Sequence, residues 1–404
     1  MARITVLGGC GTVGSVAVRT LVDLNDFSEI VIGDIDLPKA DRIVKELGTD
    51  RLSAKKVDAL NPRSIREAIK GSDVILNCIG PFYKFGPPIV KAAIEARINY
   101  VDICDDVDAT QAILKMHNQA KIANVSACIG MGSSPGVTNL LAKFCADQLL
   151  EKVDAIDIMH CHGGEETEGP GVIAHRIHSM CSEIPMFLDG KYKVVKFFEK
   201  EGIALQEDVG FHLIGKHRVY PYPHPETITL PKYIPCQRVT NKGTVIPDEY
   251  FQLIIDIVEL GMVDEEPLEV KGVNIAPFDF VIAYIIQQRE KILRETSFGE
   301  QRGCIRTVVS GKRKGKNQMY VFSLASRGQA MGEGTGIPAA FGATLMERGK
   351  IKEKGVLPPE ACINPLDFLS IMQEYLKLEK ISGKGSPLLI ESIDAEGKIE
   401  HLSL

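Results

Sequence analysis

The 404-residue sequence contains no tryptophan, and none of its apolar stretches approaches the roughly 20 residues that a transmembrane helix needs. We expect no signal peptide, because a segment typical of a β-strand begins almost at Met1. The ten cysteines are scattered and form no C-x-x-C pair, so we expect reduced thiols rather than a disulfide framework or a zinc site. These absences predict a cytoplasmic protein without a membrane-spanning segment.

Long runs of one charge are also absent, and the net charge is only −6. The short basic cluster at residues 312–316 is typical of a solvated turn between two strands, so nothing in the charge pattern indicates a nucleic-acid partner. No repeat or low-complexity segment interrupts the chain. Its length and its apolar content of 45% are sufficient for two domains with sizeable cores.

A glycine-rich turn near the N-terminus is the clearest motif that is present. Residues 3–7 predict a strand, and residues 15–22 predict a helix directly after the turn. Gly9, Gly11 and Gly14 fit the G-x-G-x-x-G pattern, in which glycines make the turn, admit a pyrophosphate and allow close helix packing. We therefore expect the turn to bind a dinucleotide through Gly9, Cys10, Gly11, Thr12, Val13 and Gly14.

An acidic residue follows the second predicted strand at the place where a ribose-binding carboxylate is expected. Asp34 lies about 20 residues after the last glycine of the turn. Its carboxylate would accept hydrogen bonds from the ribose hydroxyls and repel a 2′-phosphate. The next residue is Ile35 rather than a phosphate-binding arginine. The pattern favours NAD, with NADP as the alternative if a basic residue reaches in from elsewhere.

Strands and helices alternate through residues 1–137, which predicts a Rossmann-type, doubly wound parallel sheet. Ligands bind at the carboxyl ends of such strands, so the loops after the third and fourth strands are candidate cofactor contacts. Asp58 either bonds the adenine amine or caps the strand. The candidates in these loops are Asp58, Ala59, Asn77, Cys78, Ile79, Gly80 and Pro81.

Helix ends are also indicated in this part of the chain. Asn61 is expected to cap a helix over residues 62–70, and residues 109–124 are expected to form one helix. Ser134 followed by Pro135 is typical of an N-cap with a proline in the first turn, which predicts a helix from there to about Leu150.

The pattern changes after Leu150 and predicts an α+β domain with a mixed or antiparallel sheet over residues 138–330. Residues 153–162 alternate like a half-buried antiparallel strand. Small residues in a helix over 339–347 favour close packing, so we expect the segment 331–404 to return to the first domain. The other expected strands are residues 192–198, 210–213, 227–230, 269–273, 304–310 and 318–324.

The order of several short motifs resembles the saccharopine dehydrogenase family, which includes saccharopine reductases, lysine 6-dehydrogenases and carboxynorspermidine dehydrogenases. The resemblance covers nearly the whole chain. Its motifs are the glycine turn at 8–14, Asn-Cys-Ile-Gly-Pro-Phe at 77–82, Tyr-Val-Asp at 100–102, Gly-Ser-Ser-Pro-Gly-Val-Thr-Asn at 132–139, His-Pro-Glu at 224–226, Thr-Gly-Ile-Pro at 335–338, Gly-Val at 355–356 and Pro-Glu at 359–360.

The resemblance implies a dinucleotide-binding domain with an inserted domain for substrate binding and dimerisation. It further implies hydride transfer between NAD(P) and a carbon that bears an amino or imino nitrogen, usually in an amino acid. One departure matters: family members often have an aspartate where this chain has Ser134, which suggests a different substrate.

Oxidation of a C–N bond needs a base for the substrate ammonium and an anchor for its carboxylate. Asp102, Asp105 and Asp106 follow the fifth predicted strand, so at least one should face the cleft as base or ammonium ligand. The alternative is that Asp102 caps the next helix while the other two are solvated.

Basic and histidine side chains supply the remaining candidates. Arg176 is the expected carboxylate anchor, with a surface arginine as the alternative, and His224 is either catalytic or structural. His160 and His162 lie on one face of a strand and could join Glu165 and Glu166 at a metal, but a third ligand at a defined spacing is missing. We expect no metal and interpret the two histidines as a cleft wall.

Three functions remain open from the sequence: an amino-acid dehydrogenase acting on C–N bonds, an enoyl or carbonyl reductase, and a non-catalytic NAD-binding protein. The expected partner is a small amino-acid-like substrate. A homodimer is also expected through residues of about 150–330, because residues 251–260 and 278–286 are more apolar than solvent-facing helices should be. The alternative is that these stretches are buried inside one large domain.

Overall fold

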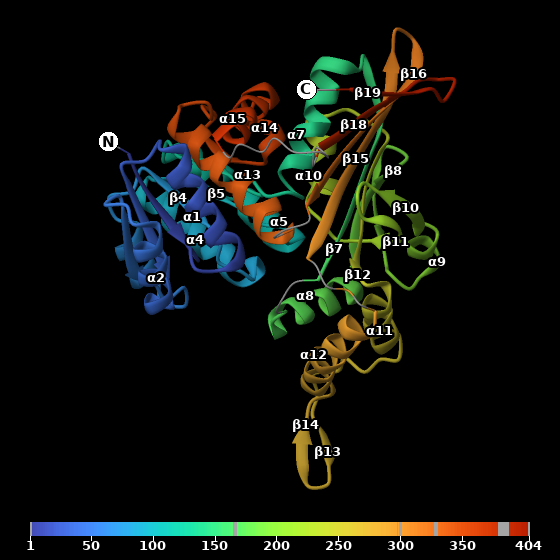
Figure 1. The fold of residues 1–404 in the computed structure, drawn as a ribbon, viewed down its shortest axis with the longest axis horizontal. Helices are drawn as coiled ribbons and strands as arrows, with labels where there is room; N and C mark the ends of the chain where they lie inside the picture. The colour runs from blue at the N-terminus through green and yellow to red at the C-terminus, as the bar shows by residue number, and fades with distance from the viewer. Residues whose placement is uncertain are drawn as a thin grey trace.

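The chain folds around two β-sheets, each covered by its own helices (Figure 1). This computed structural model describes residues 2–164, 168–296, 298, 301–326, 330–378 and 388–402. Strands within residues 3–128 build most of the first sheet and strands within residues 152–326 build most of the second, while the C-terminal segment contributes to both. No helix among the described residues is long and apolar enough to cross a membrane.

The first sheet has seven strands, and every neighbouring pair is parallel. Its order is β17-β6-β5-β4-β1-β2-β3, so the direction of winding reverses between β1 and β4. The predicted doubly wound sheet is confirmed, and the reversal marks the edge where such folds bind ligands. The strands are β1 (Arg3–Leu7), β2 (Glu29–Asp34), β3 (Leu52–Lys56), β4 (Val74–Asn77), β5 (Asn99–Asp102), β6 (Ser126–Cys128) and β17 (Gly355–Leu357).

Helices cover this sheet because each presents one apolar face to strands that are buried on both sides. Asn61 caps α3 as predicted, since its Oδ1 accepts hydrogen bonds from the N–H groups of Arg63 and Ser64. The single helix predicted over 109–124 is instead two helices, α5 and α6. The helices are α1 (Thr12–Leu24), α2 (Leu37–Leu47), α3 (Pro62–Ile69), α4 (Phe82–Ala96), α5 (Val107–Leu114), α6 (His117–Ile122), α7 (Val137–Phe144), α14 (Pro359–Cys362) and α15 (Pro365–Leu378).

Helix α13 (Ala330–Glu347) returns to the first sheet, as its small residues predicted. The same prediction was wrong for the end of the segment 331–404, because the strands over residues 388–393 and 399–402 join the second sheet. Helix α13 packs against α1, β4 and β5. A Cβ added to Gly336 would lie 2.6 Å from the carbonyl oxygen of Val13, so only glycine permits this approach to α1. The helix therefore closes one face of the dinucleotide-binding fold.

The second sheet is mixed, as predicted. Its main path is β10-β11-β12-β7-β15-β16-β18-β19, with β8 and β9 attached beside β12. Among the strands that the structure describes in this sheet, only β7 and β12 are parallel to each other, and the other pairs are antiparallel. The strands are β7 (Lys152–Gly163), β8 (Ile184–Leu188), β9 (Lys191–Val195), β10 (Glu207–Phe211), β11 (Gly215–Pro221), β12 (Arg238–Ile246), β15 (Arg302–Arg313), β16 (Lys316–Ser326), β18 (Leu388–Ile393) and β19 (Ile399–Leu402).

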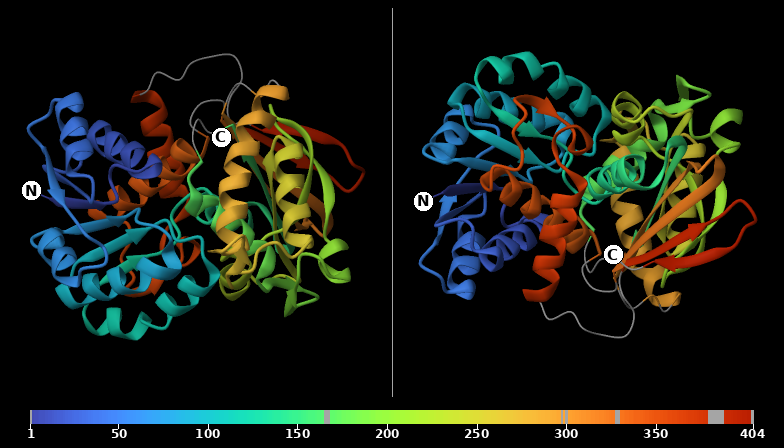
Figure 2. Two further views of the ribbon diagram at one scale, coloured as in Figure 1. Left: turned by 90° about the horizontal axis from the view of Figure 1, so that it is seen from below. Right: turned by 90° about the horizontal axis from the view of Figure 1, so that it is seen from above.

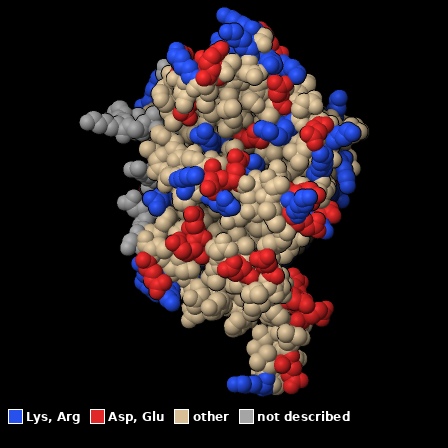
Figure 3. All heavy atoms as spheres, turned by 90° about the vertical axis from the view of Figure 1, so that its right-hand side faces the viewer, with Lys and Arg blue, Asp and Glu red and all other residues tan. Residues whose placement is uncertain are grey.

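Helices α8 (Pro170–Cys181), α11 (Asp248–Glu259) and α12 (Pro277–Glu295) share an apolar core with one face of this sheet. Figure 2 shows α11 and α12 side by side there. Short helices α9 (Lys200–Ile203) and α10 (Glu226–Tyr233) complete the domain. Between α11 and α12, a hairpin of β13 (Leu268–Val270) and β14 (Val273–Ile275) projects from the body (Figures 1 and 3).

Besides the helix over 109–124, four predictions of local structure were wrong. The strand predicted over residues 269–273 is instead a hairpin, because residues 271 and 272 form the turn between β13 and β14. Residues 227–230 lie in α10, not in a strand, although their β-branched side chains favour a strand. β7 is largely buried rather than half-buried, and it is antiparallel to β15, as predicted, but parallel to its other neighbour β12. Ser134 does not cap a helix, because α7 begins at Val137 with Gly136 as its N-cap, and the Gly136 N–H donates to Asn139 Oδ1.

Candidate active site

The glycine turn after β1 has the shape that a pyrophosphate requires. A Cβ added to Gly14 would lie 2.1 Å from the carbonyl oxygen of Gly8, which would push α1 away from the strand. Gly11 caps α1 through its backbone, and no side chain there covers the free N–H groups of the first turn. An uncapped helix N-terminus with close backbone access is suited to phosphate oxygens. The turn therefore fits the diphosphate of a nicotinamide dinucleotide.

Asp34 closes the turn from the end of β2. Its Oδ2 accepts from the Cys10 N–H at 2.9 Å, and its Oδ1 accepts from the Asp36 N–H at 3.1 Å. Ile35 is exposed. An open cavity of about 370 Å³ adjoins this carboxylate, lined by Cys10, Gly11, Thr12, Ser15, Arg19, Lys39, Arg42, Ile43 and Glu46. The adenosine side of the site thus combines a carboxylate with nearby cations.

The loops after β3 and β4 hold themselves together by polar contacts. Asp58 Oδ1 accepts from the Leu60 N–H at 2.9 Å, which is the contact of a turn cap. Asn77 is fully buried, and it donates to the Tyr100 hydroxyl and accepts from the Ile79 N–H. These contacts direct residues 78–81 past the carboxyl end of β1, where the nicotinamide half of a cofactor would lie. The position of these loops at the carboxyl ends of the strands is what supports four further cofactor candidates, Ala59, Cys78, Gly80 and Pro81.

Asp102 lies at the end of β5 and is fully buried. Its Oδ1 accepts from the N–H groups of Cys104 and Gly130, so it joins the loops after β5 and β6. It does not cap α5, whose N-cap is Asp106. Burial raises the pKa of Asp102 to about 6 in spite of these hydrogen bonds.

The next carboxylates lie where the two domains meet. Asp106 Oδ2 accepts from the Tyr83 N–H at 3.0 Å, and its Oδ1 lies 3.4 Å from Nδ1 of His175 on α8. Burial raises the pKa of Asp106, and the neighbouring charge of Asp105 adds to the effect. One acidic residue of the predicted trio therefore contacts the second domain directly.

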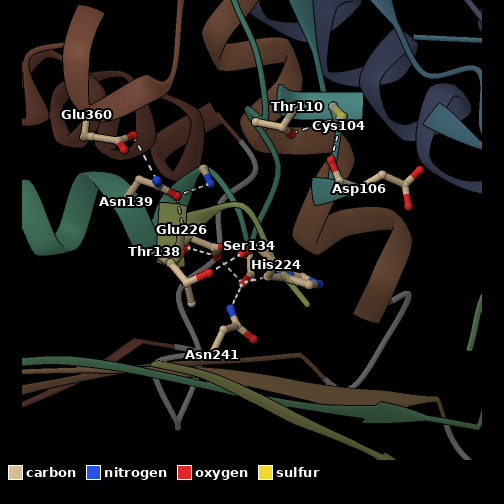
Figure 4. A network of polar contacts seen from close by, with 12 residues as sticks. Cys104, Asp106, Thr110, Ser134, Thr138, Asn139, His224, Glu226, Asn241 and Glu360 are labelled. Atoms are coloured by element: carbon tan, nitrogen blue, oxygen red, sulfur yellow. Dashed lines mark hydrogen bonds and ion pairs between the residues drawn. The ribbon is translucent and has the colours of Figure 1, made fainter. Parts of the chain in front are cut away.

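His224 faces the first domain from the loop before α10 and is held by a buried carboxylate (Figure 4). Its Nδ1 lies 3.4 Å from Glu226 Oε2 and 3.4 Å from Ser134 Oγ. Glu226 Oε1 in turn accepts from the hydroxyl groups of Ser134 and Thr138, at 2.5 and 3.0 Å. A carboxylate at Nδ1 fixes the orientation of an imidazole and leaves Nε2 to react.

The charges around His224 favour its protonated form. Burial alone would lower the pKa of His224, but the hydrogen bond and charge of Glu226 raise it, and Asp105 and Asp106 contribute in the same direction. Burial would likewise raise the pKa of Glu226, yet His224 and Ser134 lower it. The raised pKa of His224 and the lowered pKa of Glu226 therefore stabilise the charged forms of both groups, and the acidic residues after β5 lie within electrostatic reach of the histidine.

Two aromatic side chains pack against the ring of His224. The ring of His160 stacks on His224 with centroids 5.1 Å apart, and Tyr222 meets both rings edge-on. Burial lowers the pKa of His160 well below its usual value, and the charge of His224 adds to this. A Cβ on Gly243 would overlap the His160 ring at 2.0 Å, so glycine makes the room for it. The lowered pKa favours the neutral form of His160, whose ring packs on the candidate histidine.

A second buried carboxyl group extends this network into the first domain. Asn139 Nδ2 donates to Glu360 Oε2 at 2.9 Å, while Asn139 Oδ1 accepts from the Gly136 N–H (Figure 4). Burial raises the pKa of Glu360 to about 7. Asn241 completes the arrangement from β12, since its Nδ2 donates to Ser134 Oγ at 3.3 Å.

Arg176 is not a surface side chain: it is buried on α8. Its Nη2 lies 2.6 Å from Glu168 Oε1, and its Nη1 donates to the Tyr250 hydroxyl at 3.1 Å. Arg289 Nε lies 3.1 Å from the other oxygen of Glu168. This pairing occupies the nitrogens that a substrate carboxylate would need.

The described residues contain no cluster of histidine, cysteine or acidic side chains that could hold a metal ion. Glu165 and Glu166, which the sequence placed beside the two histidines of β7, lie outside the described residues.

Several site residues were assigned no individual role from the sequence. Glu226, Thr138, Asn139 and Glu360 lie in the motifs of the family resemblance, but only their burial and contacts reveal a connected network. Tyr222 and Asn241 lie in no such motif. The strand β12 that carries Asn241 was missed altogether, because its buried polar residues hide the apolar alternation of a strand.

Comparison with known proteins agrees with this architecture. Residues 4–128 match the saccharopine dehydrogenase NADP binding domain, and residues 132–378 match the saccharopine dehydrogenase C-terminal domain. Yeast saccharopine dehydrogenase (L-Glu forming) has the same fold, with a TM-score of 0.67 over 97% of this chain and 100% of that chain, at 16% identity.

Two relatives align over almost the whole length. Carboxyaminopropylagmatine dehydrogenase of Synechocystis sp. is 24% identical over 93% of this chain and 96% of its own. Carboxynorspermidine synthase of Vibrio cholerae is 25% identical over 90% of this chain and 93% of its own. With both domain types matched in order and the glycine turn in place, the chain belongs to the saccharopine dehydrogenase family of NAD(P)-binding oxidoreductases.

Proposed function

We propose that this protein transfers a hydride between a nicotinamide dinucleotide and the C–N bond of an amino-acid-like amine, as a saccharopine dehydrogenase or a lysine 6-dehydrogenase does. The observation that carries the proposal is the buried His224–Glu226 pair, which faces Asp105 and Asp106 near the nicotinamide end of the cofactor site. A histidine held by a carboxylate supplies a general acid or base, and the aspartates supply a site for an ammonium group.

In this proposal each group has one role. The cofactor, when bound, accepts or supplies the hydride. His224 takes a proton from the substrate nitrogen during amine oxidation and returns one in the reverse direction, while Glu226 holds its ring. Asp105 and Asp106 orient the nitrogen by attracting its charge, and Asp102 keeps the loops after β5 and β6 in register. Arg176 supports α8 through Glu168.

The names of the full-length relatives suggest which amines to test. They refer to carboxylated polyamines, in which an amino-acid group is joined to a polyamine chain. Ser134 stands beside Glu226 where other family members often carry an aspartate, which also favours a substrate other than saccharopine. We propose a carboxyalkyl amine as substrate class, with lysine and saccharopine as the reference compounds.

The test is turnover of the purified protein with NAD and NADP, measured as absorbance of the reduced cofactor. The panel contains lysine, saccharopine, ornithine, carboxynorspermidine and carboxyaminopropylagmatine. Turnover of at least one is expected, and His224→Ala should abolish it while leaving cofactor binding intact. Inert amines together with reduction of an enone or a ketone would favour the enoyl or carbonyl reductase instead. Cofactor binding without any turnover would favour a binding protein.

For the cofactor, we propose NAD with measurable NADP use. Asp34 favours NAD because its carboxylate repels a 2′-phosphate, whereas Lys39 and Arg42 line the adjoining cavity and favour NADP. We expect Asp34→Asn to lower the KM for NADP relative to NAD by about tenfold, since the amide keeps a hydrogen-bond acceptor but removes the charge. Lys39→Ala with Arg42→Ala is the matched variant and should raise the KM for NADP alone. An unchanged ratio in Asp34→Asn would mean that this carboxylate does not face the ribose.

We also propose a cytoplasmic homodimer. All ten cysteines are free, which supports a reducing compartment. Exposed apolar side chains on α12 and on the β13–β14 hairpin support association of two chains.

A further inference from the structure

Asn241 on β12 is fully buried, and only one end of its side-chain amide has a partner. Its nitrogen Nδ2 donates to Ser134 Oγ at 3.3 Å. Among the residues that the structure describes, its oxygen Oδ1 has no hydrogen-bond partner. A buried acceptor without a donor is destabilising, so such an atom beside a candidate site indicates a ligand that donates a hydrogen bond.

The orientation of this amide is fixed by the hydroxyl group beside it. Ser134 has one hydroxyl hydrogen, which it donates to Glu226 Oε1 at 2.5 Å. Its oxygen can therefore only accept from Asn241, so the nitrogen end of the amide must face Ser134. Figure 4 shows the nitrogen on that side and the oxygen pointing away from the network. Oδ1 is consequently the end that a ligand would meet.

The same contacts make Oδ1 a stronger acceptor than an ordinary amide oxygen. The negative charge of Glu226 polarises the hydroxyl group of Ser134, which in turn polarises the amide of Asn241. Hydrogen bonds in such a chain strengthen one another. Negative charge is thereby shifted toward Oδ1, which favours a donor that carries positive charge.

A second polar atom without a partner lies beside this oxygen. His160 pairs with Gly243, two residues after Asn241, so the histidine and the amide share one face of the sheet. Burial lowers the pKa of His160 and the nearby amide of Asn241 acts against this, yet the ring nitrogen Nε2 has no hydrogen-bond partner in the described part of the chain. The ring of His160 stacks on His224. Both atoms therefore lie close to the group that would take the substrate proton.

We propose that Asn241 Oδ1 binds the N–H group that stays on the reacting amine after His224 has taken a proton from it. This inference rests on the proposed amine oxidation. A protonated secondary amine carries two N–H groups, of which one proton goes to His224 and the other stays on nitrogen. When hydride leaves the adjacent carbon for the cofactor, the substrate becomes an iminium that still carries this N–H.

The positive charge that develops on the iminium makes its N–H a stronger donor than that of the neutral amine. Oδ1 therefore stabilises the transition state more than the bound amine. A carbonyl compound or an enone has no such donor, and a tertiary amine loses its only N–H to His224. The role of Asn241 thus predicts a site that selects primary and secondary amines.

The experiment separates the two ends of the amide by calorimetric titration of saccharopine and carboxynorspermidine, both secondary amines, into protein saturated with NADH. Asn241→Leu removes both ends and should weaken amine binding at least about tenfold. Asn241→Asp keeps an acceptor but loses the donor to Ser134, and should bind the amines within about threefold of the parent protein. A residue that only held Ser134 would give equal losses in both variants.

Turnover adds a second measurement. Because the contact strengthens as charge develops, Asn241→Leu should also lower kcat at least about tenfold, whereas Asn241→Asp should retain most of it. The control Thr244→Val changes a buried residue of the same strand on the opposite face and should match the parent protein in both measurements. Unchanged affinity for NADH verifies that each variant is folded.

The inference is wrong if Asn241→Leu binds the amines as tightly as the parent protein, or if Asn241→Asp loses as much affinity as Asn241→Leu. Amines that bind but are not oxidised would contradict only the proposed reaction. Oxidation with unchanged kcat and KM in Asn241→Leu would contradict only the role of Asn241. A parent protein whose NADH complex binds neither amine would contradict both.

Discussion

At the residue scale, the site depends on how a few buried ionisable groups share their charge. Glu226 has three partners: two hydroxyl groups that donate to it and the imidazole of His224. Glu360 is equally buried but receives one amide donor, and burial raises its pKa to about 7. Because it has more partners, Glu226 is the carboxyl group whose charged form is stabilised. Its charge in turn raises the pKa of His224.

The pH dependence of the reaction follows from this pair. The pKa of His224 is raised, so the imidazolium persists to higher pH than in an ordinary histidine. Amine oxidation should therefore accelerate as pH rises through that pKa, and the reverse reaction should slow over the same range. In Glu226→Gln the pH–rate profiles of both directions should shift to lower pH by about one unit, because the carboxylate that stabilises the imidazolium is gone. Initial rates against pH in both directions measure the shift.

The control for this prediction is Glu360→Gln, which alters the other buried carboxyl group without touching His224. The pH–rate profiles of this variant should match those of the parent protein. Titration of the His224 ring by NMR gives the same comparison without turnover. A pKa of His224 that is equal in Glu226→Gln and the parent protein would show that Glu226 does not position this histidine.

The residues of the site were only partly predictable from the sequence. The glycine turn and Asp34 follow a fixed spacing, because phosphate and ribose impose it. The carboxylates after β5 were expected near the cleft, since parallel strands end at one edge. The roles of Asp102 and Arg176 depend on groups distant in sequence, such as Gly130 and Glu168, and spacing carries no information about those contacts.

At the element scale, the sequence predicted the strands of the first domain better than those of the second. Parallel strands that are buried on both faces have continuous apolar sequences, and in the first sheet they alternate with helices. These two patterns allowed the strands of the first sheet to be predicted. β12 is buried as well, but it contains Thr240, Asn241 and Lys242, so its sequence looks like a loop. α10 shows the reverse case, because tertiary packing on β8 and β12 overrides the strand preference of its residues.

Helix α13 offers a test of close packing between elements. Gly336→Ala would place a methyl group 2.6 Å from the Val13 carbonyl oxygen, so we expect a loss of about 1–3 kcal/mol of unfolding free energy. Gly334→Ala in the same helix meets nothing closer than Ser133 Cβ at 3.8 Å, so it should be neutral or stabilise by up to about 1 kcal/mol. Urea unfolding of both variants measures the difference. Equal stabilities would mean that α13 does not press against α1.

At the scale of the whole molecule, the C-terminal part of the chain completes both sheets. The first sheet takes β17 and the covering helix α13 from residues after 330, whereas β18 and β19 extend the second sheet. The active-site network spans the same division, because Glu360 belongs to α14 and His224 to the second domain. The parts of the candidate site therefore come together only when the complete chain has folded.

This dependence predicts how fragments behave. Residues 1–137 alone lack α13 and β17, so one face of β4, β5 and α1 would be open to water. We expect this fragment to be largely unfolded and to bind NAD at least about a hundredfold more weakly than the full chain, because binding must then supply the free energy of folding. A chain that joins residues 1–150 to 330–378 through a short glycine-serine linker restores both missing elements and should recover most of the affinity. Calorimetric titration with NAD compares the three proteins. Full affinity in residues 1–137 would show that the first sheet does not need the C-terminal segment.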